Sequence, residues 1–246
     1  MFGKKIRRKT LDQVMEEIAF LKNRFHVKEI SFYDDTFTYD KKFVIELCEE
    51  IIRIGVDISW SCFSRVDFVD LSILKLMKNA GCHQLMYGLE SADDEILKNL
   101  NKKQSLDQVT EAVSATKQAG IDVRIAFMMG NPGETEVSIK KTCDYVINLD
   151  PDIMVVNILT PYPGTALYRR AKQEGLLLSE DWNKYELSNV ILNNPNLSPE
   201  FVEKQYRSMY RKFYLRPSYM LKHMLKMRTS TQWYDAIRAF GALLIR

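Results

Sequence analysis

Apolar and polar positions along the first 160 residues predict alternating helices and strands. Residues 10–25 carry apolar side chains at helical spacing, and Thr10 with Gln13 three positions later gives the capping-box pattern of a helix start. The next run, residues 28–33, is short and apolar and ends in a polar turn, which is typical of a strand. This order of a helix followed by a strand is the unit that the rest of the pattern repeats.

The unit recurs along the chain. Further helices are predicted for residues 40–54, 70–80, 105–119 and 134–149, and further strands for residues 56–63, 82–89, 121–129 and 153–159. Gly55, Gly81 and Gly120 each follow a predicted helix and precede a strand, where a left-handed helix cap needs glycine. Strand starts lie 26 to 39 residues apart, which favours an α/β fold with a parallel sheet over hairpins.

The pattern changes after Gly175. A helix is predicted to begin at Ser198-Pro199 and to stop before Pro217, so we expect a main domain over residues 1–175 and a mostly helical extension over residues 176–246. Basic residues far outnumber acidic ones from Lys204 onward. Two interpretations stay open for them: a solvated helical face that packs on the main domain, or a surface for an anionic partner.

Composition limits the class of protein. With 46% hydrophobic and 27% charged residues the chain falls in the ordinary globular class, and a net charge of +3 gives no argument for a nucleic-acid or membrane partner. No apolar run approaches the roughly 18 residues that indicate a membrane span, and the start shows no signal-peptide pattern. We therefore predict a cytoplasmic protein with no membrane span and no nucleic-acid partner.

The four cysteines, Cys48, Cys62, Cys82 and Cys143, stand far apart in the sequence. No pair has the spacing of metal ligands, and no histidine accompanies them at such a spacing. Free cysteine behaves as a small apolar residue. We therefore predict four reduced core thiols and no metal site built from this chain's own residues.

A polar cluster follows each predicted strand. In chain order these clusters are Asp34-Asp35-Thr36, Ser64-Arg65, Gly88-Leu89-Glu90-Ser91, Gly130-Asn131-Pro132-Gly133-Glu134-Thr135 and Thr160-Pro161-Tyr162-Pro163-Gly164-Thr165. Carboxyl ends of parallel strands face the same way, and ligands bind at that edge in such folds. We therefore expect these clusters to gather on one rim, where the binding site lies.

Some of these polar residues have an ordinary structural explanation. Thr135 and Thr165 suit helix caps and turns, with no ligand needed. The acid doublet Asp34-Asp35 and the acid Glu90 are harder to explain, because carboxylates directly after a buried strand are costly unless something binds or pairs with them. Arg65 and Arg124 are candidate partners for such acids.

The glycine-rich cluster after the fourth strand is not a phosphate loop. It contains no lysine, and the acid Glu134 at the start of the predicted helix would repel a phosphate. It better suits a ligand that is approached by backbone groups and that carries hydroxyls or a cationic group.

Five motifs, taken in chain order, resemble motifs of the radical S-adenosylmethionine (radical SAM) superfamily, and within it those of the cobalamin-binding branch. They are Phe32-Tyr33-Asp34-Asp35-Thr36-Phe37, Trp60-Ser61-Cys62 with Ser64-Arg65-Val66-Asp67, Gly81-Cys82 to Glu90-Ser91, Phe127 to Thr135, and Thr160 to Thr165. Together they span about residues 1–185.

The resemblance implies a partial (β/α)6 barrel with S-adenosylmethionine across its strand ends. By this resemblance, the methionyl amino group binds at Asp34, Asp35 and Thr36. The ribose hydroxyls bind at Glu90 and Ser91, and the methionyl carboxylate binds at Arg65 and Arg124. The resemblance places the adenine between two segments, Met129, Gly130, Gly133 and Glu134 on one side and Thr160 and Pro161 on the other. These assignments suit the chemistry, because carboxylates accept from ammonium and hydroxyl groups and a guanidinium fork fits a carboxylate.

In the superfamily a CxxxCxxC loop after the first strand holds a [4Fe–4S] cluster, and Phe2-Gly3-Lys4-Lys5 resembles the segment that follows that loop. We therefore expect the first strand and the cluster cysteines to lie outside this chain, which would then be inactive alone, with a separately encoded N-terminal half as one possible partner. Whether cobalamin is used stays open, as do the substrate and the reaction.

Two other functions stay open. A barrel without a cluster would bind a nucleoside or a partner protein without catalysis. An unrelated barrel enzyme, such as an aldolase or isomerase, would use Glu90 and Arg65 for acid–base chemistry.

Overall fold

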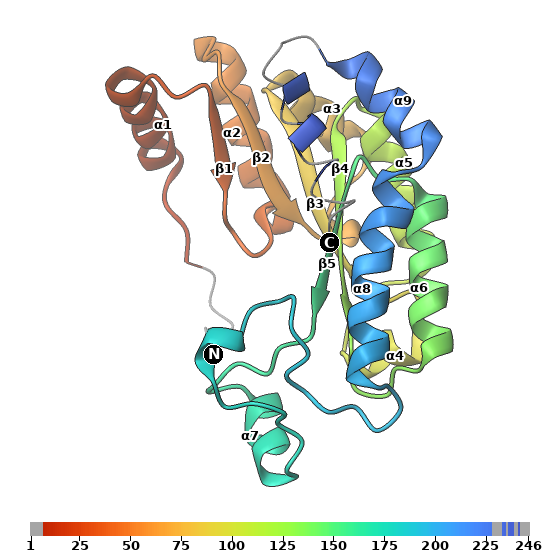
Figure 1. The fold of residues 1–246 in the computed structure, drawn as a ribbon. Helices are drawn as coiled ribbons and strands as arrows, with labels where there is room; N and C mark the ends of the chain where they lie inside the picture. The colour runs from red at the N-terminus through yellow and green to blue at the C-terminus, as the bar shows by residue number, and fades with distance from the viewer. Residues whose placement is uncertain (1–6, 228–232, 235, 239–240, 242–246) are drawn as a thin grey trace. The chain divides into compact units, whose positions relative to one another are not determined.

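The computed structural model describes residues 7–227, 233–234, 236–238 and 241. It has the α/β fold that the sequence predicts (Figure 1). The strands are β1 (Glu29–Phe32), β2 (Ser59–Ser64), β3 (Cys82–Glu90), β4 (Asp122–Met129) and β5 (Ile153–Ile158). The helices are α1 (Leu11–Phe25), α2 (Lys41–Ile54), α3 (Leu71–Asn79), α4 (Asp94–Asn99), α5 (Leu106–Gln118), α6 (Glu136–Leu149), α7 (Ala166–Gln173), α8 (Pro199–Tyr214) and α9 (Pro217–Lys226), with single 3-10 turns η1 (Phe37–Tyr39), η2 (Val66–Phe68) and η3 (Trp182–Lys184).

The strands form one sheet in the order β1-β2-β3-β4-β5, and β1, β2 and β3 pair in parallel. An order that follows the sequence, with helical crossovers on the way, belongs to the barrel type of α/β fold. A doubly wound sheet would instead reverse its order at a switch point. The predicted partial-barrel class is therefore confirmed.

The chain divides into two compact units, and the division falls within β3, β4 and β5. Unit 1 comprises residues 1–88, 104–125 and 151–153, and unit 2 comprises residues 89–103, 126–150 and 154–246. The boundary predicted at residue 175 stays a prediction.

The core of unit 1 is built around Trp60 of β2. Its side chain is fully buried, and its indole Nε1 donates a hydrogen bond of 2.7 Å to the carbonyl of Ala80. The rings of Phe32 and Phe37 each lie 5.5 Å from the Trp60 ring. Because Phe32 ends β1 and Phe37 follows its polar turn, this packing fixes where the Asp34–Thr36 segment begins and ends.

In unit 2, helix α8 closes the outer edge of β5. The hydroxyl of Tyr214 donates to the carbonyl of Met154 (2.6 Å) and accepts from its N–H (3.0 Å). The hydroxyl of Tyr210, one turn earlier, makes the same pair of bonds with Val156. Two tyrosines four positions apart thus satisfy backbone groups that an edge strand would otherwise leave unpaired.

Most of the predicted elements are confirmed, and three helices were not foreseen. Capping boxes at Thr10 and Ser105 open α1 and α5 as predicted, and Gly55 ends α2 with a φ of 66°. The sequence reasoning missed α4 and α7, and it interpreted Pro217 as a stop although Pro217 is the first residue of α9. Proline at that position lacks only an N–H that would have no partner within the helix.

No helix in the described part of the chain has the length and apolar character that crossing a membrane requires. The Phe2–Lys5 segment lies outside the described residues, and so do parts of the predicted extension at residues 228–232, 235, 239–240 and 242–246.

Candidate functional site

The polar turn after β1 is open to solvent. Asp34 and Asp35 are exposed, and the hydroxyl of Thr36 donates to the carbonyl of Asp35 at 2.8 Å. Sequence reasoning expected a buried strand before the doublet, but the residues of β1 are half-buried and exposed in alternation. The two carboxylates therefore remain hydrated, and the burial cost that singled them out does not arise.

The two arginines predicted to pair with those acids differ in their surroundings. Arg65 grips Asp67, since its Nε and Nη2 each donate to one carboxylate oxygen at 2.9 Å, and this pairing raises the pKa of Arg65. Arg124 lies on β4, and its Nε is buried with no hydrogen-bond partner in the described structure. A buried guanidinium donor without an acceptor is costly unless a ligand or water supplies one.

The segment after β4 folds into a tight turn that its own sequence specifies. The N–H of Glu134 donates to the carbonyl of Asn131 at 3.0 Å, with Pro132 and Gly133 between them. Proline in the second position and a glycine with a φ of 86° in the third are the signature of a type II turn. A Cβ at Gly133 would also lie 3.3 Å from the side-chain nitrogen of Asn99, so close packing favours glycine as well.

Glu134 holds this turn from inside. Its Oε2 accepts from the N–H groups of Gly130 (2.7 Å) and Asn131 (2.9 Å), and its Oε1 accepts from the side-chain amide of Asn131 at 3.1 Å. Both Glu134 and Asn131 are fully buried. The predicted helix began at Glu134, but α6 begins at Glu136 with Thr135 as its cap, as was expected of Thr135. This places Glu134 outside the helix, where its carboxylate turns back onto the turn.

Burial raises the pKa of Glu134 to about 7, although hydrogen bonds from Asn131 and Gly130 oppose the rise. The nearby Asp93 carboxylate raises the pKa further. Asn131 also retains a buried acceptor, since its side-chain Oδ1 has no hydrogen-bond partner in the described structure. The turn is therefore held by several internal hydrogen bonds, and the buried Oδ1 of Asn131 remains available as an acceptor.

The end of β3 brings Glu90 and Ser91 into different surroundings. Glu90 has a φ of 66° and forms an ion pair of 2.8 Å with Lys102, and both side chains are about one-fifth exposed. Ser91 is fully buried and lies 3.3 Å from the hydroxyl of Thr142. The Glu90 carboxylate thus remains partly accessible, whereas the Ser91 hydroxyl faces the interior.

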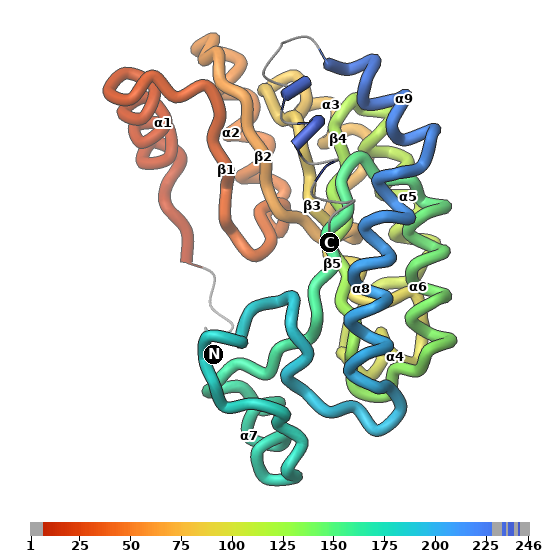
Figure 2. Tube along the Cα trace, viewed as in Figure 1, coloured from red at the N-terminus to blue at the C-terminus, as the bar shows by residue number. Residues whose placement is uncertain are grey.

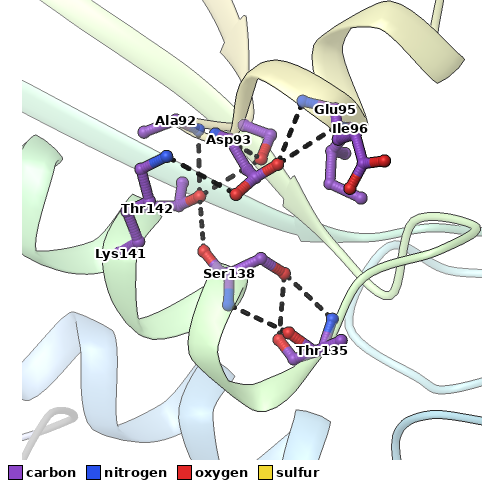
Figure 3. A network of polar contacts seen from close by, with 9 residues as sticks. Ala92, Asp93, Glu95, Ile96, Thr135, Ser138, Lys141 and Thr142 are labelled. Carbon is purple, nitrogen blue, oxygen red and sulfur yellow. Dashed lines mark hydrogen bonds and ion pairs between the residues drawn. The ribbon is translucent and has the colours of Figure 1, made fainter.

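The surroundings of Ser91 form a polar network, which Figure 3 shows from close by. The hydroxyl of Thr142, on α6, accepts from the N–H of Ala92 at 2.9 Å and donates to the carbonyl of Ser138 at 3.0 Å. Asp93 caps α4 and forms an ion pair of 3.5 Å with Lys141. These contacts tie α4 to α6 and thereby hold the segment that follows Glu90.

The last two predicted positions follow β5. Thr160 and Pro161 are buried, and the Thr160 hydroxyl donates to the carbonyl of Ile158 at 3.1 Å. The N–H of Leu159 donates to the carbonyl of Met129 at 2.9 Å, so the ends of β4 and β5 lie side by side. Met129 and the turn that follows it are thus adjacent to Thr160, and the adenine site assigned to these residues stays a prediction.

Three residues that contribute to these groups were not predicted as site residues. Lys102 neutralises Glu90, and the only signal for it was a basic pair after a short helix. Asn131 belongs to the polar cluster after the fourth strand, and its position before Pro132 and Gly133 indicates a turn residue. Asn194 bonds to that turn from the extension, and no local pattern reveals so distant a contact.

The four cysteines are free and buried, as predicted. Burial raises the pKa of Cys48 and Cys143 to about 12, so these thiols stay protonated at neutral pH. Within the described residues no group of three or more histidine, cysteine, aspartate or glutamate side chains is arranged to hold a metal ion. These residues therefore do not fit an iron–sulfur cluster, which needs several converging thiolates.

Comparison with known proteins gives the family. Residues 1–146 match the family described as the Radical SAM superfamily. A Pyrococcus horikoshii protein named as an uncharacterized methyltransferase is 36% identical over 92% of this chain and 49% of its own length. The bacteriochlorophyllide d C-12(1)-methyltransferase of Chlorobaculum tepidum is 26% identical over 95% of this chain and 51% of its own. The chain therefore spans about half the length of these relatives.

A solved structure supports the fold. The radical S-adenosylmethionine methyltransferase TsrM of Kitasatospora setae, with cobalamin and a [4Fe–4S] cluster bound, superposes with a TM-score of 0.62. It is 18% identical, and the match covers 81% of this chain and 41% of TsrM. Such low identity supports the fold and not the activity. Because the family match covers more than half of the chain, the chain belongs to the radical SAM superfamily of enzymes.

Proposed function

We propose that this chain is the S-adenosylmethionine-binding part of a radical SAM enzyme that transfers a methyl group or carries out related radical chemistry. In this superfamily S-adenosylmethionine supplies the reacting carbon group when an iron–sulfur cluster supplies the electron. Methyltransferases among the relatives support methyl transfer. Four free cysteines support a reducing compartment such as the cytoplasm.

The observation that carries the proposal is the buried Nε of Arg124, which has no acceptor among the described residues. A ligand carboxylate is the acceptor that a guanidinium fits best, because the fork donates two parallel bonds to its two oxygens. The methionyl part of S-adenosylmethionine ends in such a carboxylate. Arg65 is the weaker candidate, because Asp67 already takes two of its donors.

The other predicted residues have chemistry that suits the rest of the ligand. Exposed carboxylates at Asp34 and Asp35 suit the methionyl ammonium, and the partly exposed carboxylate of Glu90 suits ribose hydroxyls. The ion pair with Lys102 orients the Glu90 carboxylate, which would accept those bonds. The turn at residues 130–134 offers backbone groups of fixed direction to the adenine. None of these groups is proposed as a nucleophile or as a general base.

The cluster requires ligands from elsewhere. Because the described residues lack a suitable thiolate group, we propose that the cluster cysteines belong to another segment of the whole protein or to a separately encoded N-terminal half. Cobalamin is a further candidate cofactor, since TsrM carries it. The substrate is proposed only as a small molecule.

Titration with S-adenosylhomocysteine by isothermal calorimetry tests the proposal. We expect the wild-type chain to bind and Arg124→Gln to weaken binding by about tenfold to a hundredfold, because a bond to a charged group contributes about 1.5–3 kcal/mol. Arg53→Gln is the control, since Arg53 pairs with Glu50 on the exposed surface of α2. Absence of binding by the wild-type chain, or equal losses in both variants, would refute the proposal.

Iron uptake tests the assignment of the cluster. After anaerobic reconstitution with iron and sulfide, we expect the chain alone to remain without a cluster. Uptake of about four irons per chain would show that its own cysteines converge after all.

A further inference from the structure

The segment between α7 and α8 contributes one buried side chain to the turn after β4. Figure 2 follows this segment, in teal to light blue, from α7 to α8. Its Asn194 is 8% exposed, and its side-chain Nδ2 donates a hydrogen bond of 3.0 Å to the carbonyl of Asn131. The two residues are 63 positions apart in the chain. This side chain therefore connects the predicted extension to the turn at residues 130–134.

The orientation of the Asn194 amide is fixed from both ends. Its Oδ1 accepts from the N–H of Asn196 at 3.0 Å, and its Nδ2 requires the carbonyl acceptor on Asn131. The backbone carbonyl of Asn194 also accepts from the N–H of Leu197 at 3.1 Å. In the flipped amide, Oδ1 would face the carbonyl oxygen of Asn131 and Nδ2 would face the N–H of Asn196, so neither hydrogen bond could form. Only one orientation therefore satisfies both partners.

The bond from Asn194 ends on the same carbonyl oxygen that closes the turn. The carbonyl of Asn131 already accepts the 3.0 Å bond from the N–H of Glu134 that closes the turn. Asn194 donates to the second lone pair of the same oxygen. Glu134 thus holds the turn from within its own sequence, and Asn194 holds it from the extension.

We propose that Asn194 is a positioning residue for S-adenosylmethionine: it fixes the direction in which the turn at residues 130–134 presents its backbone groups to the ligand. The inference rests on the proposed function. A turn that presents backbone groups binds well only when it is preorganised, because ordering it on binding would reduce affinity. The extension is thereby a part of the binding site, although no residue of it was predicted to be one.

Backbone contacts of the same segment support this role. The N–H of Ile158 donates to the carbonyl of Leu187 at 2.7 Å, and the Thr160 hydroxyl lies 3.4 Å from the carbonyl of Glu186. The segment therefore also braces the end of β5, through backbone groups that most sequences supply. Among the hydrogen bonds from this segment to the ends of β4 and β5 and the turns that follow them, the bond from Asn194 depends on the identity of the segment's side chain, and this makes Asn194 the residue to test.

Asn194→Asp is the sharpest substitution. Aspartate keeps the shape and the acceptor toward Asn196, but it replaces the donor by a carboxylate oxygen facing the carbonyl of Asn131. Asn193→Asp is the matched control, because it adds the same charge one residue earlier. Asn193 is exposed, and its backbone N–H donates to the carbonyl of Leu176, a bond that the substitution leaves in place. Asn194→Ala removes the donor without adding charge, in case the aspartate variant does not fold.

Two measurements decide the inference. Calorimetry with S-adenosylhomocysteine should show about tenfold weaker binding for Asn194→Asp and no change for Asn193→Asp, at a temperature where both variants are fully folded. Hydrogen–deuterium exchange should be faster at the amides of Gly130 and Asn131 in Asn194→Asp, and unchanged in the control.

The outcomes separate this inference from the proposed function. If the wild-type chain binds the ligand and Asn194→Asp binds equally well, Asn194 has no positioning role although the chain still binds S-adenosylmethionine. If the wild-type chain does not bind, the proposed function fails and the inference with it, whatever the exchange rates show. Unchanged exchange at Gly130 and Asn131 overturns the inference in either case.

Discussion

Replacing Glu134 by glutamine removes a buried charge and keeps the shape of the side chain. The glutamine oxygen can take the place of Oε2, which accepts from two backbone N–H groups. Its NH2 group then faces Asn131, whose Oδ1 lacks a partner in the described structure and can accept once the Asn131 amide turns over. That rotation gives up a long bond of 3.3 Å to the carbonyl of Met128. We therefore expect Glu134→Gln to fold.

The pH dependence of stability gives the magnitude. Burial raises the pKa of Glu134 from 4.5 to about 7 in the folded chain. As the pH rises from 4.5 to 7, the unfolded chain loses this proton first, so the folded state binds more protons and the free energy of unfolding falls. The difference of 2.5 pKa units, at 1.36 kcal/mol each, gives a loss of about 3 kcal/mol in the wild-type chain. The neighbouring Asp93 acts in the same direction, and its ion pair with Lys141 limits that contribution.

Urea unfolding followed by far-UV circular dichroism measures this difference. Between pH 5 and pH 8 we expect the wild-type chain to lose about 2–3 kcal/mol relative to Glu134→Gln, with most of the loss complete by pH 7.5. Glu136→Gln is the control, because Glu136 is exposed at the start of α6 and pairs only loosely with Lys140. The control should follow the wild-type profile.

Two results would refute the reasoning. Parallel profiles for the wild-type chain and Glu134→Gln would show that the carboxyl group titrates at an ordinary pKa. A wild-type chain that gains stability relative to the variant as the pH rises would show that the hydrogen bonds to Glu134 outweigh its burial and hold its pKa below 4.5.

Two further substitutions test the turn and the sheet edge. Gly133→Ala should lower the melting temperature more than Gly130→Ala. Both glycines have a positive φ, so backbone strain costs about 1–2 kcal/mol in each variant. A Cβ at Gly133 would also crowd the side chain of Asn99 on α4, whereas a Cβ at Gly130 would meet no atom within 4 Å. Equal losses would contradict the packing argument. Tyr214→Phe should lower the free energy of unfolding by about 1–3 kcal/mol, because it leaves the N–H and carbonyl of Met154 without their partner. Tyr33→Phe, at an 82% exposed position, should change neither quantity.

The fold was predictable where short-range chemistry decides it. Thr10 and Ser105 sit three residues before a glutamine, and each pair closes a capping box that needs no tertiary contact. Helix α4 was missed because it has only six residues, too few for a periodic pattern, although Asp93 before two further acids was an available start signal. Pro217 was misinterpreted because proline suits both the end of one helix and the first turn of the next.

The sequence predicts positions for a candidate site, whose role in binding stays a prediction, but it does not predict the contacts that their side chains make. The sequence places polar residues after each strand, and the structure confirms the strands that they follow. Which partner each side chain takes depends on distances that no spacing encodes. Arg65 pairs with Asp67, two residues away, and Glu90 pairs with Lys102, twelve residues away beyond α4. No local pattern marks Asp67 as the partner of Arg65 in preference to the acids after β1, and none marks Lys102 as the partner of Glu90.

The turn at residues 130–134 shows how local and distant contacts divide the work. Its shape follows from Pro132 and Gly133, and its internal hydrogen bonds follow from Glu134, so the residues that form it belong to one short motif. The bond from Asn194 comes from a segment that the motif does not specify. A change in the extension can therefore alter how firmly the turn is held without altering the motif itself. The motif at residues 130–134 therefore sets the shape of the turn, whereas the affinity for the ligand also depends on Asn194 of the extension.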